Sequence, residues 1–430
     1  MIETAPLFQI LILIVFILGY LAIIFEYTFK VNKTGVALFI AVLCWSIYFS
    51  SSHLPLSEDI KILNEHLADV SQIIFFLLGA MTLVELIDTH KGFKIVTDVI
   101  RTTSRRKMLW TISFMTFFLS AILDNLTTTI LMVSLLRKLI PNRSDRILLS
   151  CIVVVAANAG GAWTPIGDVT TTMLWINGQL SSLKVIQALF LPSLISLLVP
   201  LFIYSKKHKG SFDIKEEIPT DVIPEPGARL VFFLGLGTMI FVPIFKTLTG
   251  LPPFMGILIG LSILWLVTDM LHHKFENRQH LRIPAILTKV DTSGILFFLG
   301  ILLVINALEA AGILTQLAAW LNREIHNEVA IATLIGILSS IIDNVPLVAG
   351  TMGMYSLADY PMDVPLWHMI AYAAGTGGSM LLIGSSSGVA MMGMEKIDFL
   401  EYMRKISIPV FIGYLAGMGV YLLQHFLFVV

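Results

Sequence analysis

The stretch Ser120-Ala-Ile-Leu-Asp124-Asn125-Leu-Thr-Thr-Thr places an acid, an amide and several hydroxyls in the middle of an apolar segment. That segment, 108–136, has 29 residues, and Asp124 is its only charge. A straight helix of this length would measure roughly 44 Å, too long for one crossing of a bilayer core of about 30 Å and too short for two. We therefore expect a re-entrant hairpin of two short helices. Irregular backbone at such depth is tolerated where protein or a wet cavity surrounds it, so the tip is expected to line a site.

A second segment repeats this pattern. Residues 329–357 also number 29, and their only charge is Asp343, which follows Asp124 by 219 residues. The order Ser339-x-x-x-Asp343-Asn344 reproduces the order of the first segment. Two further pairs of stretches align in the same sequence order, namely 158–168 with 375–385 and 76–88 with 297–309. Three landmarks in one order predict an internal repeat.

The composition is that of a polytopic membrane protein. Hydrophobic residues make up 56% of the 430-residue chain and charged residues 13%, and the mean hydropathy is +0.86. An ordinary soluble domain is excluded, and nothing suggests nucleic-acid binding. Cys44 and Cys151 both lie in apolar segments, so neither a disulfide framework nor a cysteine-based metal site is expected. The first apolar segment, 7–25, lacks a basic start and a cleavage site and is interpreted as a retained helix.

Apolar segments divide the chain into an all-α polytopic membrane fold with inverted repeats. Two of them, 147–177 and 365–394, are interrupted by glycine pairs, and such paired interruptions in corresponding halves indicate a transporter's binding site. The other expected spans are 7–26, 34–51, 71–88, 185–204, 228–248, 252–271, 292–310 and 407–428, with the hairpins at 108–136 and 329–357. The expected domains are N-terminal helices 1–52, repeat 1 at 53–210, a central linker with helices at 211–275, and repeat 2 at 276–430.

The distribution of Lys and Arg predicts the topology. With re-entrant hairpins and singly crossing broken helices, the chain makes ten crossings, and 24 of the 28 basic residues then fall on one side. This side is expected to be cytoplasmic, which places both termini outside. An odd number of crossings separates the repeats, so they are predicted to be inverted. The amphipathic stretches 91–107 and 311–326 are expected to lie in the membrane interface.

Three acids are expected at mid-membrane depth: Asp124, Asp168 and Asp343. The hairpins and broken segments contain no Lys or Arg, so the missing counter-charge is a proton or a metal cation. Desolvation favours the protonated form of a carboxyl group and a bound cation favours the ionised form, so the two compete. In a transporter that exposes its site alternately to the two sides of the membrane, this competition between proton and cation predicts cation/proton exchange. The three acids are thus the predicted Na⁺ or Li⁺ ligands.

Amide and hydroxyl oxygens near these acids suit a hard cation. The candidates are Ser120, Asn125, Thr128, Asn158, Thr164, Thr170, Thr171, Ser339, Asn344, Ser379 and Ser385. Structural roles compete with this interpretation. Asp124 and Asp168 have the sequence context of helix N-caps, and Ser120 and Ser339 are equally compatible with bonding back to a carbonyl of their own helix. Free half-helix N-termini would instead suit an anion.

The chain resembles the NhaD-type sodium/proton antiporters of the ion transporter superfamily. The resemblance rests on LDNLTTT at 123–129, NAGGAWTPIGDVTTTMLW at 158–175, IIDNVPL at 341–347 and GTGGSMLLIGSSSG at 375–388. It implies a homodimer in a bacterial-type inner membrane, with no cofactor, that exchanges cytoplasmic Na⁺ or Li⁺ for external protons by an elevator-like movement. The second repeat departs from the first, with Ser385 at the position of Asp168 and Gly375 at that of Asn158. Two equivalent ion sites are therefore not expected.

Two other functions compete with cation/proton exchange as interpretations of the sequence. A sodium-coupled organic-anion or arsenite transporter of the same fold would carry Ser-Asn-Thr hairpin tips, whereas this chain has Asp-Asn tips. An intramembrane aspartyl protease would also use two buried acids. It needs a Tyr-Asp and a Gly-x-Gly-Asp signature, and here the contexts are Leu123-Asp124 and Ile166-Gly167-Asp168. A secondary transporter, and no enzyme, is therefore the prediction.

Overall fold

The computed structural model describes residues 6–24, 26–52, 54–97, 100, 102–140, 142–207, 210–212, 224–381, 384–397 and 399–428. Within these ranges the regular secondary structure is helical. The first half contains α1 (Pro6–Ile24), α2 (Glu26–Phe29), α3 (Lys33–Ser51), α4 (Leu56–Thr89), α5 (Lys94–Thr97), α6 (Arg105–Ser120), α7 (Asn125–Leu139), α8 (Arg143–Ala162), α9 (Val169–Ile176) and α10 (Ser182–Lys207). The second half contains α11 (Ala228–Thr249), α12 (Pro253–His272), α13 (Ile283–Leu287), α14 (Thr292–Ala310), α15 (Ile313–Ile325), α16 (Glu328–Leu338), α17 (Asn344–Met354), α18 (Pro365–Gly377), α19 (Ser386–Glu395), α20 (Phe399–Tyr402) and α21 (Ile408–Phe428).

The predicted apolar spans are present as long helices. Among the described residues, nine helices are long and apolar enough to cross a membrane. The span expected at 71–88 is the C-terminal part of the much longer α4, which has 34 residues. The fold is therefore that of an all-α polytopic membrane protein, as the composition predicts.

Both predicted hairpins are pairs of short helices. Residues 121–124 join α6 to α7, and residues 339–343 join α16 to α17. The predicted broken segments are likewise pairs, because α8 ends at Ala162 before α9 begins, and α18 ends at Gly377 before α19 begins. Asp124 and Asp343 occupy the N-cap positions of α7 and α17, so each acid stands where its hairpin turns back.

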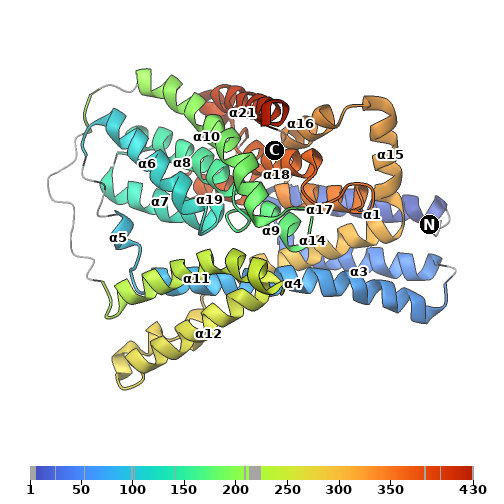
Figure 1. Cartoon of the computed structure of the whole chain (residues 1–430), viewed down its shortest axis with the longest axis horizontal. Helices are drawn as coiled ribbons and strands as arrows, with labels where there is room; N and C mark the ends of the chain where they lie inside the picture. The colour runs from blue at the N-terminus through green and yellow to red at the C-terminus, as the bar shows by residue number, and fades with distance from the viewer. Residues whose placement is uncertain are drawn as a thin grey trace.

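Figure 1 shows the helices in two groups, with α3, α4, α11 and α12 forming a lower layer. The hairpin and broken helices lie in the other group with α10 and α21, which pack side by side. Within that group, α6 packs on α8 and α16 packs on α18. The second arm of each hairpin contacts the half-helix of the other broken segment, since α7 packs on α19 and α17 on α9. The four half-helices and two hairpins thus surround one centre.

Close backbone contacts explain two of the predicted glycine pairs. A Cβ atom at Gly160 would lie 2.2 Å from the carbonyl oxygen of Phe117, and one at Gly377 would lie 2.2 Å from that of Gly336. No side chain fits at such distances, so only glycine lets each hairpin arm touch its broken helix. Both hairpins therefore make the same kind of contact at corresponding positions.

Four of the loops that carry basic residues, at 89–107, 137–146, 205–216 and 395–405, contact one another. Arg105 pairs with Asp145 at 2.7 Å and also donates to the Ser211 carbonyl, which joins three of these loops. Arg143 donates to the carbonyls of Glu395 and Lys396, which adds a fourth. The shared location of these loops is what a strong charge bias across a membrane requires.

Two other expectations concern connecting segments. The amphipathic stretch 311–326 contains α15, a helix of 13 residues, whereas 91–107 holds only the four-residue α5 before α6 begins. Most of the segment 208–227, which contains the start of the expected central linker and connects α10 to α11, lies outside the described residues.

Candidate functional site

The two half-helices that follow the breaks begin at polar caps. Asp168 is the N-cap of α9, and its Oδ1 accepts hydrogen bonds from the Thr170 amide at 2.9 Å and the Thr170 hydroxyl at 2.7 Å. Ser385 is the N-cap of α19, and its hydroxyl accepts a bond from the Gly388 amide at 3.2 Å. The capping role considered for Asp168 is therefore confirmed. Because only one of its oxygens serves the cap, the other remains for the site.

That second oxygen is bound by the first hairpin. Nδ2 of Asn125, the first residue of α7, lies 2.6 Å from Oδ2 of Asp168 and 3.1 Å from Oδ1 of Asn158. Asp168 is 1% exposed and Asn158 is fully buried. The hairpin tip, the end of α8 and the start of α9 thus meet in one hydrogen-bonded cluster.

Asn158 extends the cluster into the second half of the chain. Its Nδ2 donates to the hydroxyls of Ser379 and Ser385, each at 2.9 Å, and its Oδ1 accepts from the Ser387 hydroxyl at 2.6 Å. All polar capacity of this buried amide is used, which fixes its orientation. Ser387 was missed as a site residue by sequence reasoning. Its place two positions after Ser385, in a run of serines inside a glycine-rich break, was the available signal.

The threonines divide between structural bonds and an open hydroxyl. The hydroxyl of Thr164 donates to the Ala121 carbonyl at 2.6 Å and so fixes the hairpin turn, and that of Thr171 donates across the break to the Ala162 carbonyl at 3.3 Å. Thr128 differs, because its fully buried Oγ1 has no hydrogen-bond partner among the described residues. A buried hydroxyl without a partner is costly unless a ligand satisfies it.

Ser120 and Ser339 connect each hairpin to its broken helix. Ser120 donates to the Ala157 carbonyl at 2.6 Å, and Ser339 donates to the Ala374 carbonyl at 2.9 Å. The alternative that these serines bond back within their own helices is therefore wrong. The accepting carbonyls belong to the residues immediately before Asn158 and Gly375, which are the two positions that the alignment of the repeats pairs.

Asp124 caps its hairpin with both oxygens. Oδ1 accepts from the Thr127 amide and Oδ2 from the Thr127 hydroxyl, each at 2.7 Å. Asp343 caps α17 through the Val345 amide at 3.1 Å, and its charge also interacts with that of Lys33 at the start of α3. The neighbouring Asn344 is buried, 3% exposed.

The three acids do not share one coordination shell. Within the described parts of the chain, no three His, Cys, Asp or Glu side chains converge in a way that could hold a metal ion. Asp124 and Asp343 nevertheless lie near enough for their charges to interact with Asp168. A cation here would therefore be held by one carboxylate with amide and hydroxyl oxygens, inside the field of two more acids.

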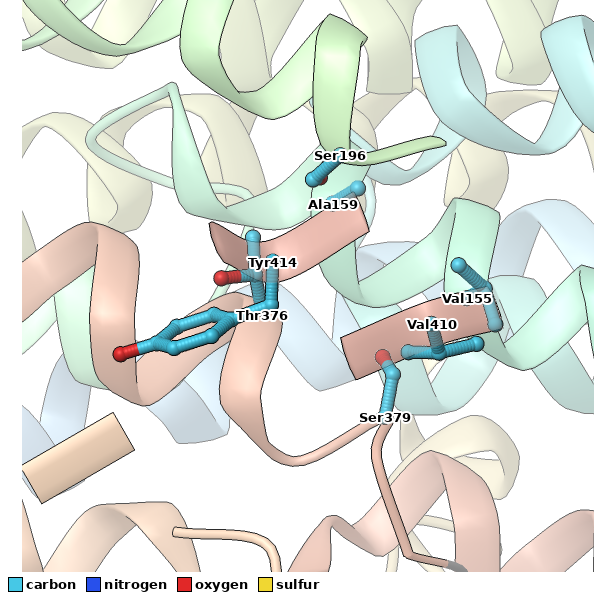
Figure 2. A pocket seen from close by; sticks show the side chains of 7 residues that line it. All are labelled: Val155, Ala159, Ser196, Thr376, Ser379, Val410 and Tyr414. Carbon is cyan, nitrogen blue, oxygen red and sulfur yellow. The ribbon is translucent and has the colours of Figure 1, made fainter. Parts of the chain in front are cut away.

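A small cavity adjoins the cluster. Figure 2 shows side chains from α8, α10, α18 and α21 converging around it, with Ser379 and Thr376 contributed by the second broken helix and its break. Its volume is about 10 Å³, close to the minimum for one water molecule. Ser379 lines this cavity and accepts the hydrogen bond from Asn158, so the cavity reaches the edge of the polar cluster.

Comparisons with known proteins find similarity to membrane transporters. A family model described as citrate transporter matches residues 20–367. Sodium/proton antiporter 1 of Arabidopsis thaliana is 54% identical over 418 residues, which cover 96% of this chain and 72% of the relative. Sodium/proton antiporter 2 of the same plant is 51% identical over 417 residues, covering 96% and 99%.

A bacterial relative extends the similarity. The Na⁺/H⁺ antiporter NhaD of Vibrio cholerae is 28% identical over 447 residues, covering 96% of this chain and 91% of the relative. The alignments with these three relatives each cover 96% of the chain, and the family model covers both hairpins and the first broken helix. The chain therefore belongs to the citrate transporter family, as a multi-pass membrane transport protein related to the NhaD-type Na⁺/H⁺ antiporters and not an enzyme.

Proposed function

We propose that this protein is a secondary antiporter that exchanges cytoplasmic Na⁺, and also Li⁺, for external protons. The observation that carries the proposal is the buried carboxylate of Asp168, whose second oxygen accepts a hydrogen bond from the side-chain amide of Asn125 and from no other described residue. A desolvated carboxylate needs a positive partner, either a proton or a cation. The antiporter names of relatives at 54% and 51% identity agree with this reading.

Proton and cation compete for Asp168 in this mechanism. When Asp168 is ionised, Na⁺ is held by its carboxylate, by Oδ1 of Asn125 after the amide turns over, and by the open hydroxyl of Thr128. Asn158 positions these groups, because in either orientation of Asn125 its Nδ2 donates to Ser379 and Ser385 and its oxygen accepts from Ser387. When a proton replaces the cation, Asn125 and Thr170 retain the carboxyl group in place. Asp124 and Asp343 raise the local negative potential that draws cations in.

Alternating access is proposed to involve the two halves as inverted repeats. The corresponding serine bonds of Ser120 and Ser339 and the corresponding glycine contacts of Gly160 and Gly377 support a repeat. The group containing the hairpins and broken helices would move against the group containing α3, α4, α11 and α12. The limits of the two repeats, 53–210 and 276–430, remain part of the proposal as predicted from the sequence. The proposal also keeps the basic loops in the cytoplasm, both termini outside and a homodimer in the inner membrane.

Anion transport is the second candidate, because the matching family model is described as citrate transporter. Half-helix N-termini at Asp168 and Ser385 would favour an anion. The carboxylate of Asp168 stands at one of these termini and would repel a tricarboxylate. We therefore rank cation exchange first.

The test uses purified protein in proteoliposomes with an entrapped pH-sensitive dye. Na⁺, Li⁺, K⁺ and citrate are added in turn at several pH values. We expect proton movement on Na⁺ or Li⁺ that is lost in Asp168→Asn, because asparagine retains the cap of α9 but cannot exchange a proton. Thr172→Ser is the matched control in the same half-helix. Citrate uptake without cation-driven proton movement would overturn the proposal.

A further inference from the structure

The tip of the second hairpin lies against the other helix group. α1 and α14 pack on α3, so they belong with α3, α4, α11 and α12, and we call these six helices the scaffold group. Ile342, next to Asp343 in the turn between α16 and α17, packs against a buried cluster of scaffold side chains. The members of this cluster are Tyr20, Ala37, Phe297 and Ile301. The hairpin tip therefore contacts a surface built by α1, α3 and α14.

A lysine of the scaffold group lies near the same tip. The ammonium of Lys33, the first residue of α3, is 5.0 Å from the centre of the Phe297 ring, and its charge interacts with the carboxylate of Asp343. The Tyr20 hydroxyl lies close to the backbone of Asp343. A nearby cation stabilises a carboxylate that is partly removed from water. Lys33 supplies this cation from outside the hairpins and the broken segments.

The start of α3 is held on α14. The Thr34 hydroxyl donates to the Ser293 carbonyl at 3.0 Å and lies 3.0 Å from the Ser293 hydroxyl. Further along the two helices, Nε1 of Trp45 donates to the Leu303 carbonyl at 2.8 Å. These bonds fix α3 relative to α14, so Lys33 has a defined place on the surface that receives the tip.

The second arm of the hairpin, α17, lies beside α14 in a defined register (Figure 1). Its tip packs on the cluster that contains Phe297, near the start of α14. At the other end of α17, a Cβ atom at Gly353 would lie 3.1 Å from Oε2 of Glu309, near the end of α14. A shift of α17 along α14 by one helical turn, about 5.4 Å, would move Asp343 away from Lys33. The interaction of Asp343 with Lys33 therefore depends on the relative position of the two helix groups.

The first hairpin has different neighbours. Its second arm, α7, packs on α6, α8 and α19, which all belong to the group that contains the hairpins. Both carboxylate oxygens of Asp124 accept hydrogen bonds from Thr127 in the same hairpin. The two tips occupy corresponding places in the sequence and yet have different surroundings in this conformation. Such a difference is expected when one conformation of an inverted-repeat transporter is observed.

We propose that Lys33 is a positioning residue that holds the tip of the second hairpin on the scaffold group through the carboxylate of Asp343. The role of this contact in transport rests on the proposed alternating access. When the hairpin group moves, the pair separates and Asp343 loses its cation. Its full negative charge then adds to the field at Asp168, with which it already interacts. The pair thereby links the position of the hairpin to the attraction of the site for Na⁺.

Hydrogen–deuterium exchange of the purified full-length protein tests the contact. Peptides that cover 339–344 report on the second tip, and peptides that cover 120–125 report on the first tip as an internal control. The test variants are Lys33→Gln, Asp343→Asn and the double variant, since asparagine can still cap α17. Lys30→Gln is the matched control, because Lys30 is an exposed lysine just before α3. Lys33→Arg keeps the charge and serves as the conservative variant.

We expect Lys33→Gln to accelerate deuterium uptake at the second tip by about fivefold and to leave the first tip unchanged. The double variant should exchange no faster than the faster single variant, because either substitution removes the same interaction. Lys33→Arg and Lys30→Gln should resemble the wild type. Equal uptake in Lys33→Gln and Lys30→Gln, or additive effects in the double variant, would overturn the proposal. Faster uptake at both tips would also overturn it, because the whole hairpin group would then have loosened.

Proton movement in proteoliposomes separates this inference from the proposed function. Release of the second tip in Lys33→Gln should change the maximal rate of Na⁺-driven proton movement by at least about twofold. An unchanged rate in a variant whose tip is released would refute the link to alternating access. If no cation drives proton movement through the wild type while the tips behave as expected, the proposed function fails and the contact stands. If the wild type exchanges Na⁺ and the second tip stays protected in Lys33→Gln, the contact alone fails.

Discussion

Asn125 reaches Asp168 with its amide nitrogen 2.6 Å from a carboxylate oxygen, although 43 residues separate them in the chain. The same nitrogen lies 3.1 Å from the oxygen of Asn158. One amide therefore connects the hairpin tip to both halves of the first broken helix. A movement of the hairpin tip would therefore displace a hydrogen-bond donor of Asp168.

Asn158→Ala should weaken both the fold and exchange. The substitution removes a buried amide that makes four side-chain hydrogen bonds and leaves Ser379, Ser385 and Ser387 without their shared partner. Unpaired buried groups cost roughly 1–3 kcal/mol each, although the cluster relaxes in part. We expect a clear fall in melting temperature in detergent and at least about a tenfold loss of exchange. Melting like that of Asn177→Ala, a change at the half-buried C-cap of α9, would contradict this.

Gly160→Ala should disrupt the first hairpin contact. The added Cβ would stand 2.2 Å from the Phe117 carbonyl oxygen, so α6 and α8 would have to separate. Gly393→Ala in α19 is the control, because a Cβ there meets nothing within 4 Å, and alanine favours the helix by about 1 kcal/mol. Differential scanning fluorimetry should show a lower melting temperature for the first variant and an equal or higher one for the second. Equal melting of both would refute the close contact.

Glu395→Gln should destabilise the link between the two broken helices. Glu395 is 2% exposed and binds Arg146 through two hydrogen bonds of 2.7 and 2.9 Å. Removing one partner of a buried ion pair leaves an uncompensated charge and costs about 3–5 kcal/mol. Glu401→Gln removes a more exposed acid that contacts Lys405 and Arg143 and should cost less than about 1 kcal/mol. Unfolding of the two variants by increasing denaturant concentration compares their stabilities. A similar loss of stability in both variants would contradict the stabilising role of the buried ion pair.

Lys246→Met should loosen the far end of α9. The Lys246 ammonium lies 4.4 Å from the centre of the Trp175 ring and donates to the Trp175 carbonyl, so α11 holds the C-terminal end of the half-helix that Asp168 begins. We expect faster hydrogen exchange in α9 and an altered maximal exchange rate. The half-saturating Na⁺ concentration should change by less than about twofold, because Lys246 does not contact the central cluster. A large change in that concentration would place Lys246 in the cation site.

Stability should fall on acidification through His90. Burial, more than the charge of the nearby His272, lowers the pKa of His90 from 6.5 to about 4. Between these pH values the unfolded chain binds a proton that the folded chain does not, so unfolding becomes easier as the pH falls. The contribution of neutral His90 to the free energy of unfolding is fully present above pH 6.5, and it is lost as the pH falls from 6.5 to about 4. His90→Gln should show a smaller drop in melting temperature across this interval, and an unchanged drop would contradict the assignment.

The sequence by itself determined the membrane class, the hairpins and the broken helices. These features depend on local quantities, namely segment length, apolar content, a lone acid and glycine pairs that stop a helix. The hairpin at 108–136 and the break within 147–177 accordingly lie where they were predicted, to within a few residues at each end. The sequence also identified Asn125, Asn158, Asp168, Ser379 and Ser385 as candidates, because polar groups are costly in lipid unless they serve a site.

Only the tertiary structure decided which of these groups meet. Asn158 contacts Ser385 and Ser387 across more than 220 residues, a pairing set by helices packing on one another and not by any local pattern. The same packing bonded Ser120 and Ser339 to neighbouring helices and placed Thr128 without a partner among the described residues. It also brought Asn125 to Asp168, whereas the hydrogen bonds of Asp124 go to Thr127 in its own helix. Side-chain hydrogen bonds act over about 3 Å, so they follow from the final arrangement of the helices and cannot be deduced from the order of residues alone.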